Sequence, residues 1–296
     1  MHEKVLVTGA SGNAGQRICR DLVDSGYDVR MADTAAPSSS KESLSMEFVR
    51  CDTRIPSDAR RAVEGVDAVI HLAAWHSAHR PPASDASIFS VNVDGTFHIL
   101  EACKEEGVTS LVFASSMAYG WHSIYAVSKV IGENLCSAFH EKTGASVAML
   151  RYNEFIPRPY LEFGAHLLTN GVDRRDVSAA TLASLRAVFE RRIGIFMGIV
   201  HNSNNQSMPQ AVLDSFAARG PSWCEEKVPG SVELLEKYGI PLPEKVEYYD
   251  IAEVERVLGW RPTVGFLEFL KDLKVRDGRH EDLTLLRVPS ELPALL

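Results

Sequence analysis

Three glycines between a short apolar segment and a helix-like segment constrain the fold of this chain most strongly. Val5–Val7 has the pattern of a strand, and Gly9, Gly12 and Gly15 follow it just before a helix-like stretch over about residues 14–25. Such a turn places the N–H groups of a helix N-terminus where they bind phosphate groups. Gly9 allows a tight turn, Gly12 lets the backbone approach a pyrophosphate, and Gly15 permits close packing of helix on strand. The motif predicts a dinucleotide-binding loop, the alternative being a tight strand–helix turn without a ligand.

Strand and helix patterns alternate after this loop. Strands are expected at about residues 27–32, 46–51, 68–73, 110–114, 147–151 and 193–197, and helices at about 57–64, 88–106, 125–142 and 178–191. Alternation of this kind is typical of a parallel sheet with helices on both faces. Right-handed crossovers then favour the doubly wound strand order. We therefore expect an α/β fold with a doubly wound parallel sheet of the Rossmann type.

The regular alternation fades after Arg151, and Pro157 soon interrupts the backbone. We expect residues 1–152 to form an NAD-binding domain, with a return to the sheet at about 176–200. Residues 153–296 are expected to form mainly a smaller, less regular lobe that binds the substrate. This lobe is expected to close over the carboxyl edge of the sheet, where ligands of such folds bind.

Composition excludes several classes of protein. A net charge of −8 without a basic run argues against general binding of nucleic acid or anionic membranes. No apolar run approaches the roughly 18 residues of a membrane span, and the first strand follows Met1–Lys4 too closely for a signal peptide. The cysteines favour free thiols in a reducing compartment over a metal site, because no C-x-x-C motif occurs among Cys19, Cys51, Cys103, Cys136 and Cys224. We therefore expect a cytoplasmic protein without a bound metal.

Tyr125 and Lys129 indicate the chemistry. Residues four apart lie on one face of a helix, so the two side chains are neighbours. A free tyrosine has a pKa near 10, and lowering it to about 7 needs roughly 4 kcal/mol of preferential stabilisation of the phenolate. A neighbouring ammonium supplies part of this, and an oxidised nicotinamide ring supplies more. Together with the glycine loop, the pair predicts hydride transfer in which Tyr125 moves a proton to or from a substrate oxygen.

Asp33 bears on which cofactor binds. It ends the second predicted strand, where a carboxylate accepts hydrogen bonds from both hydroxyls of an adenosine ribose. Its negative charge would repel a 2′-phosphate. Asp33 therefore favours NAD over NADP, the alternative being a solvated turn residue.

Further strings of residues give a family resemblance. They are Cys51–Thr53, His71–Ala74, Asn92–Thr96, Phe113–Gly120 and Tyr249–Pro262. With the glycine loop and the Tyr–Lys pair, they resemble the extended short-chain dehydrogenases/reductases, that is, the NAD-dependent epimerase/dehydratase superfamily, which includes sugar dehydrogenases. The resemblance is specific from Val5 to about Arg151 and looser to about Trp260.

The resemblance implies roles for individual residues. Asp52 would contact the adenine, and Lys129 would bind the nicotinamide ribose. Ser115 stands where the family has its catalytic serine or threonine, and Ser116 is the neighbouring candidate. The catalytic residues predicted are Ser115, Tyr125 and Lys129. The residues predicted to bind the cofactor are Gly9, Ser11, Gly12, Asn13, Ala14, Gly15, Asp33, Asp52, Thr53, Leu72, Ala73, Ala74, Asn92, Tyr125 and Lys129.

The chain departs from the family just before Tyr125. Relatives have a long connection between the Tyr-Gly string and the catalytic tyrosine, whereas here only residues 121–124 separate Gly120 from Tyr125. That connection helps to wall the substrate pocket in the family. We therefore expect a more open site, or Trp121 and His122 beside the substrate. A packed edge position for Trp121 and a surface position for His122 are the alternatives.

Several polar and aromatic residues are candidates for substrate binding. Those predicted are Trp75, His76, Ser116, Trp121 and Asn153, because they follow strands at the edge of the sheet where ligands bind. His79 and Arg158 lie in the same loops. Arg174 and Arg175 either meet an anionic substrate group or belong to a charged turn. His76 and His79 lack a carboxylate or cysteine at ligand spacing, so no metal is expected there.

Three reactions share this machinery. A dehydratase is disfavoured, because Ser116-Met117 replaces the acidic pair that the family uses for loss of water. An epimerase needs a roomy pocket and a tightly held NAD, but the substrate lobe here is short. We therefore favour an NAD-dependent oxidoreductase that interconverts a secondary alcohol and a ketone on a sugar, cyclitol or related polyol. A (nucleotide-)sugar epimerase is the alternative, and a non-catalytic NAD-binding regulator is a third class.

The long helices suggest the oligomeric state. The segments 88–106 and 125–142 carry more apolar surface than one face of a sheet needs. In the family these helices pair across a dyad, so the resemblance implies a homodimer. Cover by the C-terminal lobe is the alternative.

Overall fold

The computed structural model describes residues 3–37, 46–76 and 82–288 and divides into two compact units. The first unit comprises the described residues of Met1–Tyr152, Ser178–Gly198 and Arg256–Gly259. The second comprises those of Asn153–Val177, Ile199–Glu255 and Trp260–Leu296. The chain therefore leaves the first unit after Tyr152 and re-enters it twice.

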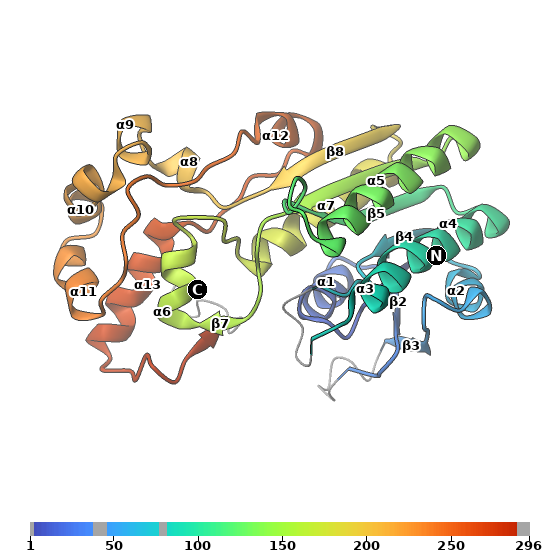
Figure 1. The fold of residues 1–296 in the computed structure, drawn as a ribbon, viewed down its shortest axis with the longest axis horizontal. Helices are drawn as coiled ribbons and strands as arrows, with labels where there is room; N and C mark the ends of the chain where they lie inside the picture. Colours follow the sequence, from blue (N-terminus) through green and yellow to red (C-terminus); the bar gives the residue numbers. More distant parts are fainter. Residues whose placement is uncertain (1–2, 38–45, 77–81, 289–296) are drawn as a thin grey trace. The chain divides into compact units, whose positions relative to one another are not determined.

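The first unit is built on a seven-stranded sheet, in the order β3-β2-β1-β4-β5-β6-β8 (Figure 1). The pairs from β3 to β6 are all parallel. The strands are β1 (Lys4–Thr8), β2 (Asp28–Asp33), β3 (Glu47–Arg50), β4 (Ala68–His71), β5 (Ser110–Ser116), β6 (Ser146–Tyr152) and β8 (Ile195–Val200). The order reverses between β1 and β4, as in doubly wound sheets. The predicted α/β fold of the Rossmann type is confirmed.

Helices follow the strands of the first unit. They are α1 (Asn13–Asp24), α2 (Pro56–Val63), α3 (Asp85–Phe89), α4 (Gly95–Glu106), α5 (Ile124–Thr143) and α7 (Arg174–Phe189). The single helix predicted over 88–106 is wrong in one respect, because a π-helical turn at Ser90–Asp94 separates α3 from α4. Asn92 lies in this turn with its side chain buried, and π-turns of this kind are frequent at functional sites.

Helix α5 lies unusually close to strand β5. A Cβ atom on Gly132 would come within 2.4 Å of the Phe113 ring, so only glycine allows this separation. Phe113, Cys136 and Phe139 are buried in one core cluster with residues of β4 and β6. The close packing matters for the site, because it brings the first turns of α5 against the carboxyl end of β5.

The second unit is mostly helical. Its helices are α6 (Tyr160–His166), α8 (Asn204–Ser207), α9 (Gln210–Leu213), α10 (Phe216–Lys227), α11 (Ser231–Lys237) and α13 (Phe266–Gly278), and α12 (Ala252–Leu258) begins in it. Strands β7 (Arg158–Pro159) and β9 (Arg287–Val288) form an antiparallel pair. Stacked and tilted aromatic rings of Tyr160, Phe266 and Phe269 form the core of this unit. Among the described residues of the whole chain, no helix is long and apolar enough to cross a membrane.

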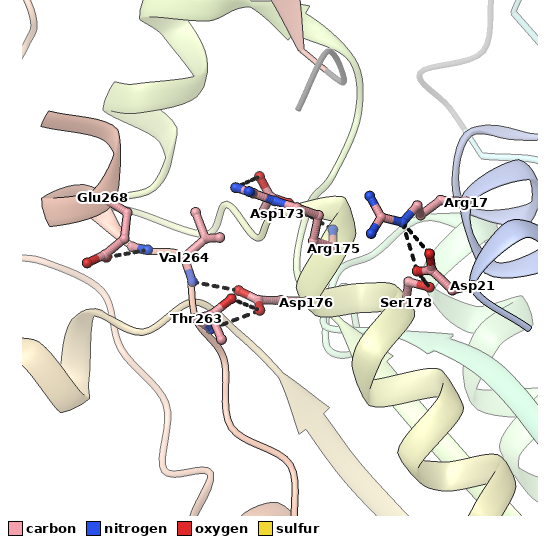
Figure 2. A network of polar contacts seen from close by, with 10 residues as sticks. Arg17, Asp21, Asp173, Arg175, Asp176, Ser178, Thr263, Val264 and Glu268 are labelled. Carbon is pink, nitrogen blue, oxygen red and sulfur yellow. Dashed lines mark hydrogen bonds and ion pairs between the residues drawn. The ribbon is translucent and has the colours of Figure 1, made fainter. Parts of the chain in front are cut away.

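The N-terminal turn of α7 is fixed by polar contacts (Figure 2). Asp176 accepts hydrogen bonds from the backbone N–H of Thr263 and of Val264, each at 2.9 Å, and burial raises its pKa to about 6. Arg175 pairs with Asp173 through Nε at 2.9 Å. The predicted helix start at residue 178 is therefore too late, and Arg175 pairs with Asp173 at the start of this helix.

Candidate active site

The loop after β1 requires glycine at two positions. Gly9 has φ +68°, and a Cβ there would lie 2.8 Å from the backbone nitrogen of Ala73. A Cβ on Gly15 would lie 2.3 Å from the carbonyl oxygen of Gly9. The Gly12 N–H donates to the same Gly9 oxygen at 3.1 Å, which closes the turn. These contacts hold the loop tightly between β1, the N-terminus of α1 and the residues that follow β4.

The N-terminus of α1 is suited to an anion. Gly12 is its N-cap, no side chain caps the helix, and its first turn contains no acidic residue. The N–H groups of the first turn and the positive end of the helix dipole therefore favour a negatively charged ligand. The geometry fits the pyrophosphate of a dinucleotide.

Asp33 lies at the end of β2, beside the same loop. Its Oδ2 accepts the Ser11 N–H at 3.0 Å, and its Oδ1 accepts the Thr34 N–H at 2.7 Å. Oδ1 also accepts the Thr34 hydroxyl at 3.3 Å. A carboxylate accepts about four hydrogen bonds, so Oδ2 keeps capacity for a ribose hydroxyl. Ser11 is fixed in turn, because its hydroxyl donates to Ala35 O at 2.7 Å. The loop and Asp33 thus form one hydrogen-bonded frame.

Asp52 lines a cavity of about 390 Å³ at the ends of β2 and β3, together with Thr34, Arg50, Ile55, Asp58 and Arg61. Its carboxylate pairs with Arg54, through Nη2 at 2.6 Å, and this hydrogen bonding lowers its pKa. Thr53 is buried, and a Cβ on Gly95 would meet its Oγ1 at 2.4 Å. Asp52 is therefore placed to face a ligand, whereas Thr53 packs against α4.

The buried Asn92 side chain is held by contacts within the protein. Its Oδ1 accepts the Trp75 N–H at 2.8 Å, and its Nδ2 donates to Trp75 O at 2.9 Å and to Ser128 Oγ at 2.8 Å. Both polar atoms of the buried amide are thus engaged within the protein. Asn92 therefore fixes the segment after β4 to helix α5, and its place among the cofactor-binding residues stays a prediction. The sequence alone does not show whether the Asn92 amide binds a ligand or other parts of the chain, because both uses need the same side chain.

Tyr125 and Lys129 meet at the end of β5. Helix α5 begins one residue before Tyr125, where the Ser123 hydroxyl caps it by accepting the Ala126 N–H at 3.2 Å. The Lys129 ammonium donates to Ala114 O at 2.8 Å and lies 6.0 Å from the centre of the Tyr125 ring. Burial lowers the pKa of Lys129 to about 8. Lys129 is therefore still mainly protonated at neutral pH.

The two serines at the end of β5 are turned in different directions. Ser115 is 4% exposed, and its hydroxyl donates to Glu133 Oε1 at 2.5 Å. Ser116 hydrogen-bonds with Tyr125, and its Oγ accepts the Ala118 N–H at 3.1 Å. The Ser115 hydroxyl is thus directed to Glu133 and Ser116 is the serine beside Tyr125, while the catalytic role of either serine stays a prediction. Alternating strand residues point to opposite faces, and the strand continues through Ser116.

Burial also affects Tyr125 itself. It raises the pKa of Tyr125, and the hydrogen bond from Ser116 opposes this by stabilising the phenolate. The Ser116 oxygen already accepts a backbone N–H, so its own proton is directed to the tyrosine oxygen or to a substrate oxygen. A cation near the phenol is needed before Tyr125 becomes a base at neutral pH.

Sequence reasoning missed His71, which is 2% exposed at the end of β4. Its Nδ1 lies 2.7 Å from Thr8 Oγ1, and its Nε2 lies 3.1 Å from Thr96 Oγ1. The Thr96 hydroxyl donates to Asn92 O at 2.6 Å, so it must accept from His71 Nε2. Thr8 Oγ1 accepts the Ala73 N–H at 3.3 Å, so its proton is free for His71 Nδ1. The histidine is thereby fixed as the neutral tautomer with its proton on Nε2.

The remaining predicted substrate residues lie in different settings. The His76 ring meets the Tyr125 ring edge-on at 6.1 Å, and Trp75 and Trp121 are both exposed, Trp121 to 60%. His122 is exposed, and His79 lies outside the described residues. Asn153, in the second unit, is 3% exposed, and neither atom of its side-chain amide has a hydrogen-bond partner among the described residues. Such a buried amide is a candidate for binding a polar ligand or water.

The glycine loop at a helix N-terminus and the Tyr–Lys pair thus both lie on a doubly wound sheet. The chain belongs to the NAD dependent epimerase/dehydratase family, whose sequence profile matches residues 5–176. The family resemblance noted from the sequence is confirmed, and NAD is the cofactor. Among the described residues, no group of three or more metal-binding side chains is found.

Known relatives include both dehydrogenases and epimerases. The chain is 30% identical to uronate dehydrogenase of Pseudomonas syringae pv. tomato over 174 residues, which is 53% of this chain and 61% of that one. The match to the Pseudomonas putida enzyme likewise covers less than two thirds of the relative, at 62%. A putative UDP-glucose 4-epimerase of Methanocaldococcus jannaschii is 25% identical over 90% of this chain and 96% of its own. A crystal structure of a UDP-galactose 4-epimerase shares the fold, with a TM-score of 0.65 and 23% identity over 94% of this chain and 99% of that one.

The buried neutral His71 predicts a particular response to acid. Burial and the charge of Lys129 lower its pKa from 6.5 to about 3. Because the folded-state pKa is the lower one, the stability that His71 contributes is complete above about pH 6.5 and is lost as the pH falls towards 3. In urea unfolding at several pH values, the unfolding free energy of His71→Gln should fall less steeply with decreasing pH than that of the wild type. The difference between the two slopes should be up to about one bound proton. The exposed His122→Gln should keep the wild-type slope, and equal slopes for wild type and His71→Gln would contradict the assignment.

Proposed function

We propose that this protein is an NAD-dependent oxidoreductase that interconverts a secondary alcohol and a ketone on a sugar, cyclitol or related polyol. The observation that supports this most is the grouping of Tyr125, Lys129 and Ser116 at the carboxyl end of β5. Ligands of doubly wound sheets bind at this edge. The three side chains are the acid/base, the cation and the hydroxyl donor that such a reaction needs.

In the proposed mechanism, the chemistry that NAD would supply when bound is hydride transfer at the substrate carbon. Ser116 donates a hydrogen bond to the reacting oxygen, because its own oxygen is occupied by the Ala118 N–H. Tyr125 takes the proton from the alcohol or returns it to the ketone. The Lys129 ammonium stabilises the phenolate of Tyr125 and is held in place by Ala114 O. Ser115 and Thr53 have structural roles in this scheme.

The cofactor-binding residues follow from the frame around the loop. We propose that the first turn of α1, with Asn13, Ala14 and Gly15, binds the pyrophosphate and that Asp33 binds the adenosine ribose. The half-buried Leu72, Ala73 and Ala74 after β4 would border the nicotinamide side, and Asp52 the adenine side.

The short connection before Tyr125 favours a dehydrogenase over an epimerase. Residues 121–124 add no element that covers the first turn of α5, and Trp121 is largely exposed. An epimerase must retain its ketone intermediate while the sugar turns, whereas a dehydrogenase needs one pose. The uronate dehydrogenases and an L-arabinose 1-dehydrogenase of Haloferax volcanii, 32% identical over 143 residues, support a sugar substrate. We further propose that Trp75 and His76 contact this substrate.

An epimerase remains the second candidate. The match to the putative UDP-glucose 4-epimerase of Methanocaldococcus jannaschii covers nearly the whole of both chains, unlike the dehydrogenase matches. A panel of sugars, uronates, cyclitols and UDP-sugars, incubated with NAD, tests the choice. Steady formation of NADH with one of the free sugars, uronates or cyclitols is expected. An isomerised UDP-sugar without net change of the cofactor would contradict the dehydrogenase and establish the epimerase.

The two serines give a matched pair of variants. Ser116→Ala should lower kcat by about 10²- to 10³-fold, because it removes a hydrogen bond made to the reacting oxygen. Tyr125→Phe should lower kcat by about 10²- to 10⁴-fold and leave the Kd for NAD nearly unchanged. Ser115→Ala should retain kcat within a few fold, since its hydroxyl faces Glu133. If Ser115→Ala loses activity while Ser116→Ala keeps the wild-type kcat, Ser115 is the catalytic hydroxyl, as the sequence predicted.

The homodimer stays a prediction. Phe89 of α3, Phe97 of α4 and Val127 and Val130 of α5 are exposed apolar side chains of the first unit. We propose that a second copy of the chain covers them, since such exposed apolar residues on neighbouring helices favour association. Light scattering should give twice the mass of one chain, and a monomer at micromolar concentration would contradict the proposal.

A further inference from the structure

The ring of Tyr119 lies on a guanidinium that the core of the first unit holds in place. Arg151, near the end of β6, donates to the buried Glu133 of α5 through Nε and through Nη2, each at 2.7 Å. Two parallel hydrogen bonds of this kind fix the plane of the guanidinium as well as its position. Its central carbon lies 4.1 Å from the centre of the Tyr119 ring, well within the range of a cation–π contact.

Tyr119 belongs to a tight turn that follows β5. The Trp121 N–H donates to Ala118 O at 3.0 Å, and Gly120 has φ +84°, as the third residue of a type II turn requires. Tyr119 is the second residue of this turn and is 42% exposed. Burial in the core therefore explains only part of its position, and the contact with Arg151 supplies the rest.

The turn is attached to the last two residues of β6. The Met117 N–H, at its start, donates to Tyr152 O at 3.0 Å, and the Tyr119 ring packs on the residue before Tyr152. The turn also provides a contact to Ser116, whose Oγ accepts the Ala118 N–H at 3.1 Å. The direction of the Ser116 hydroxyl therefore depends on where the turn is held.

We propose that Tyr119 and Arg151 are positioning residues for Ser116. Their stack holds the turn so that the Ala118 N–H occupies the Ser116 oxygen and the Ser116 proton is directed to the reacting oxygen. The proposal rests on the proposed function, because Ser116 acts on a substrate oxygen in that reaction. Neither Tyr119 nor Arg151 touches substrate or cofactor in this scheme.

Loss of the stack would act through the direction of one hydroxyl. Without the Tyr119 ring on Arg151, the middle of the turn is released, and the Ala118 N–H no longer stays on Ser116 Oγ. The Ser116 hydroxyl then changes between rotamers, and its hydrogen bond to the reacting oxygen is made only part of the time. Because that hydrogen bond stabilises the transition state, kcat should fall while the Kd for NAD stays unchanged.

Exchange of the Ala118 amide hydrogen, followed by NMR, tests the stack without any turnover. In Tyr119→Leu this amide should exchange about tenfold faster than in the wild type, because its hydrogen bond to Ser116 opens more often. Tyr119→Phe keeps the ring and should retain the slow exchange. As a matched control, Tyr248→Leu removes a tyrosine of the second unit that is 41% exposed, and it should change nothing at Ala118.

Kinetics with the polyol that the enzyme accepts test the role of the stack in the reaction. Tyr119→Leu should lower kcat by about tenfold, whereas Tyr119→Phe should stay within about threefold of the wild type. The loss should disappear in a Ser116→Ala background, where no hydroxyl is left to position, and should remain complete in a Ser115→Ala background. A merely structural role would give the same factor in both backgrounds.

Arg151 is tested together with its charge partner, since removal of Arg151 alone leaves Glu133 buried and unpaired. The double variant Glu133→Gln/Arg151→Leu removes both charges and the planar group under the ring. Arg151→Lys keeps the charge but not the pair of parallel hydrogen bonds. Both should speed exchange of the Ala118 amide, and an unchanged rate in the folded double variant would overturn the proposal.

Other outcomes would also overturn the proposal. An unchanged exchange rate in Tyr119→Leu would show that the stack does not hold the turn. Faster exchange without loss of kcat, or an equal loss of kcat when Ser116 is absent, would show that the stack does not position Ser116. Failure of the proposed function is distinguishable, because the wild type would then turn over no polyol while the amide exchange still reports whether the stack holds the turn.

Discussion

The hydrogen bond from the Lys129 ammonium to Ala114 O is the interaction on which the site depends. It joins helix α5 to the last residues of β5, and the glycine at position 132 lets the helix come close enough for it to form. A buried ammonium is costly unless it is hydrogen-bonded and near a negative charge. Satisfying it fixes Tyr125 one turn earlier, beside Ser116. The same contact that stabilises the packing therefore assembles the chemistry.

A chain of buried hydrogen bonds links this helix to the glycine loop. It runs from Thr8 at the end of β1 through His71 and Thr96 to the backbone of Asn92. The Asn92 amide continues it to Ser128, whose hydroxyl donates to Tyr125 O at 2.7 Å. Each hydrogen bond in this chain has an assigned donor and acceptor, so the network defines a single arrangement of these side chains. The glycine loop and the helix that carries Tyr125 are thus held in register by buried side chains.

The sequence predicted those parts of the structure that rest on local patterns. The glycine spacing and the strand–helix alternation led to the doubly wound sheet, and the spacing of Tyr125 and Lys129 placed them on one face of a helix. The sequence alone does not decide between Ser115 and Ser116, because their contacts depend on where β5 ends and on a carboxylate 18 residues away on another element. The π-turn was not predicted and the contacts of Asn92 could not be, since long-range hydrogen bonds decide them. The hydrogen-bonding role of His71 was not predicted, because the sequence around a buried histidine in a strand does not show which residues it contacts.

The central claim is that Tyr125 and Ser116, and not Ser115, act on the reacting oxygen. A crystal structure of the protein with NAD and a bound substrate or product measures this most directly. We expect Tyr125 Oη and Ser116 Oγ both to lie within hydrogen-bond distance of the same substrate oxygen, while Ser115 still donates to Glu133. A substrate oxygen held by Ser115, or bound away from Tyr125, would contradict the account.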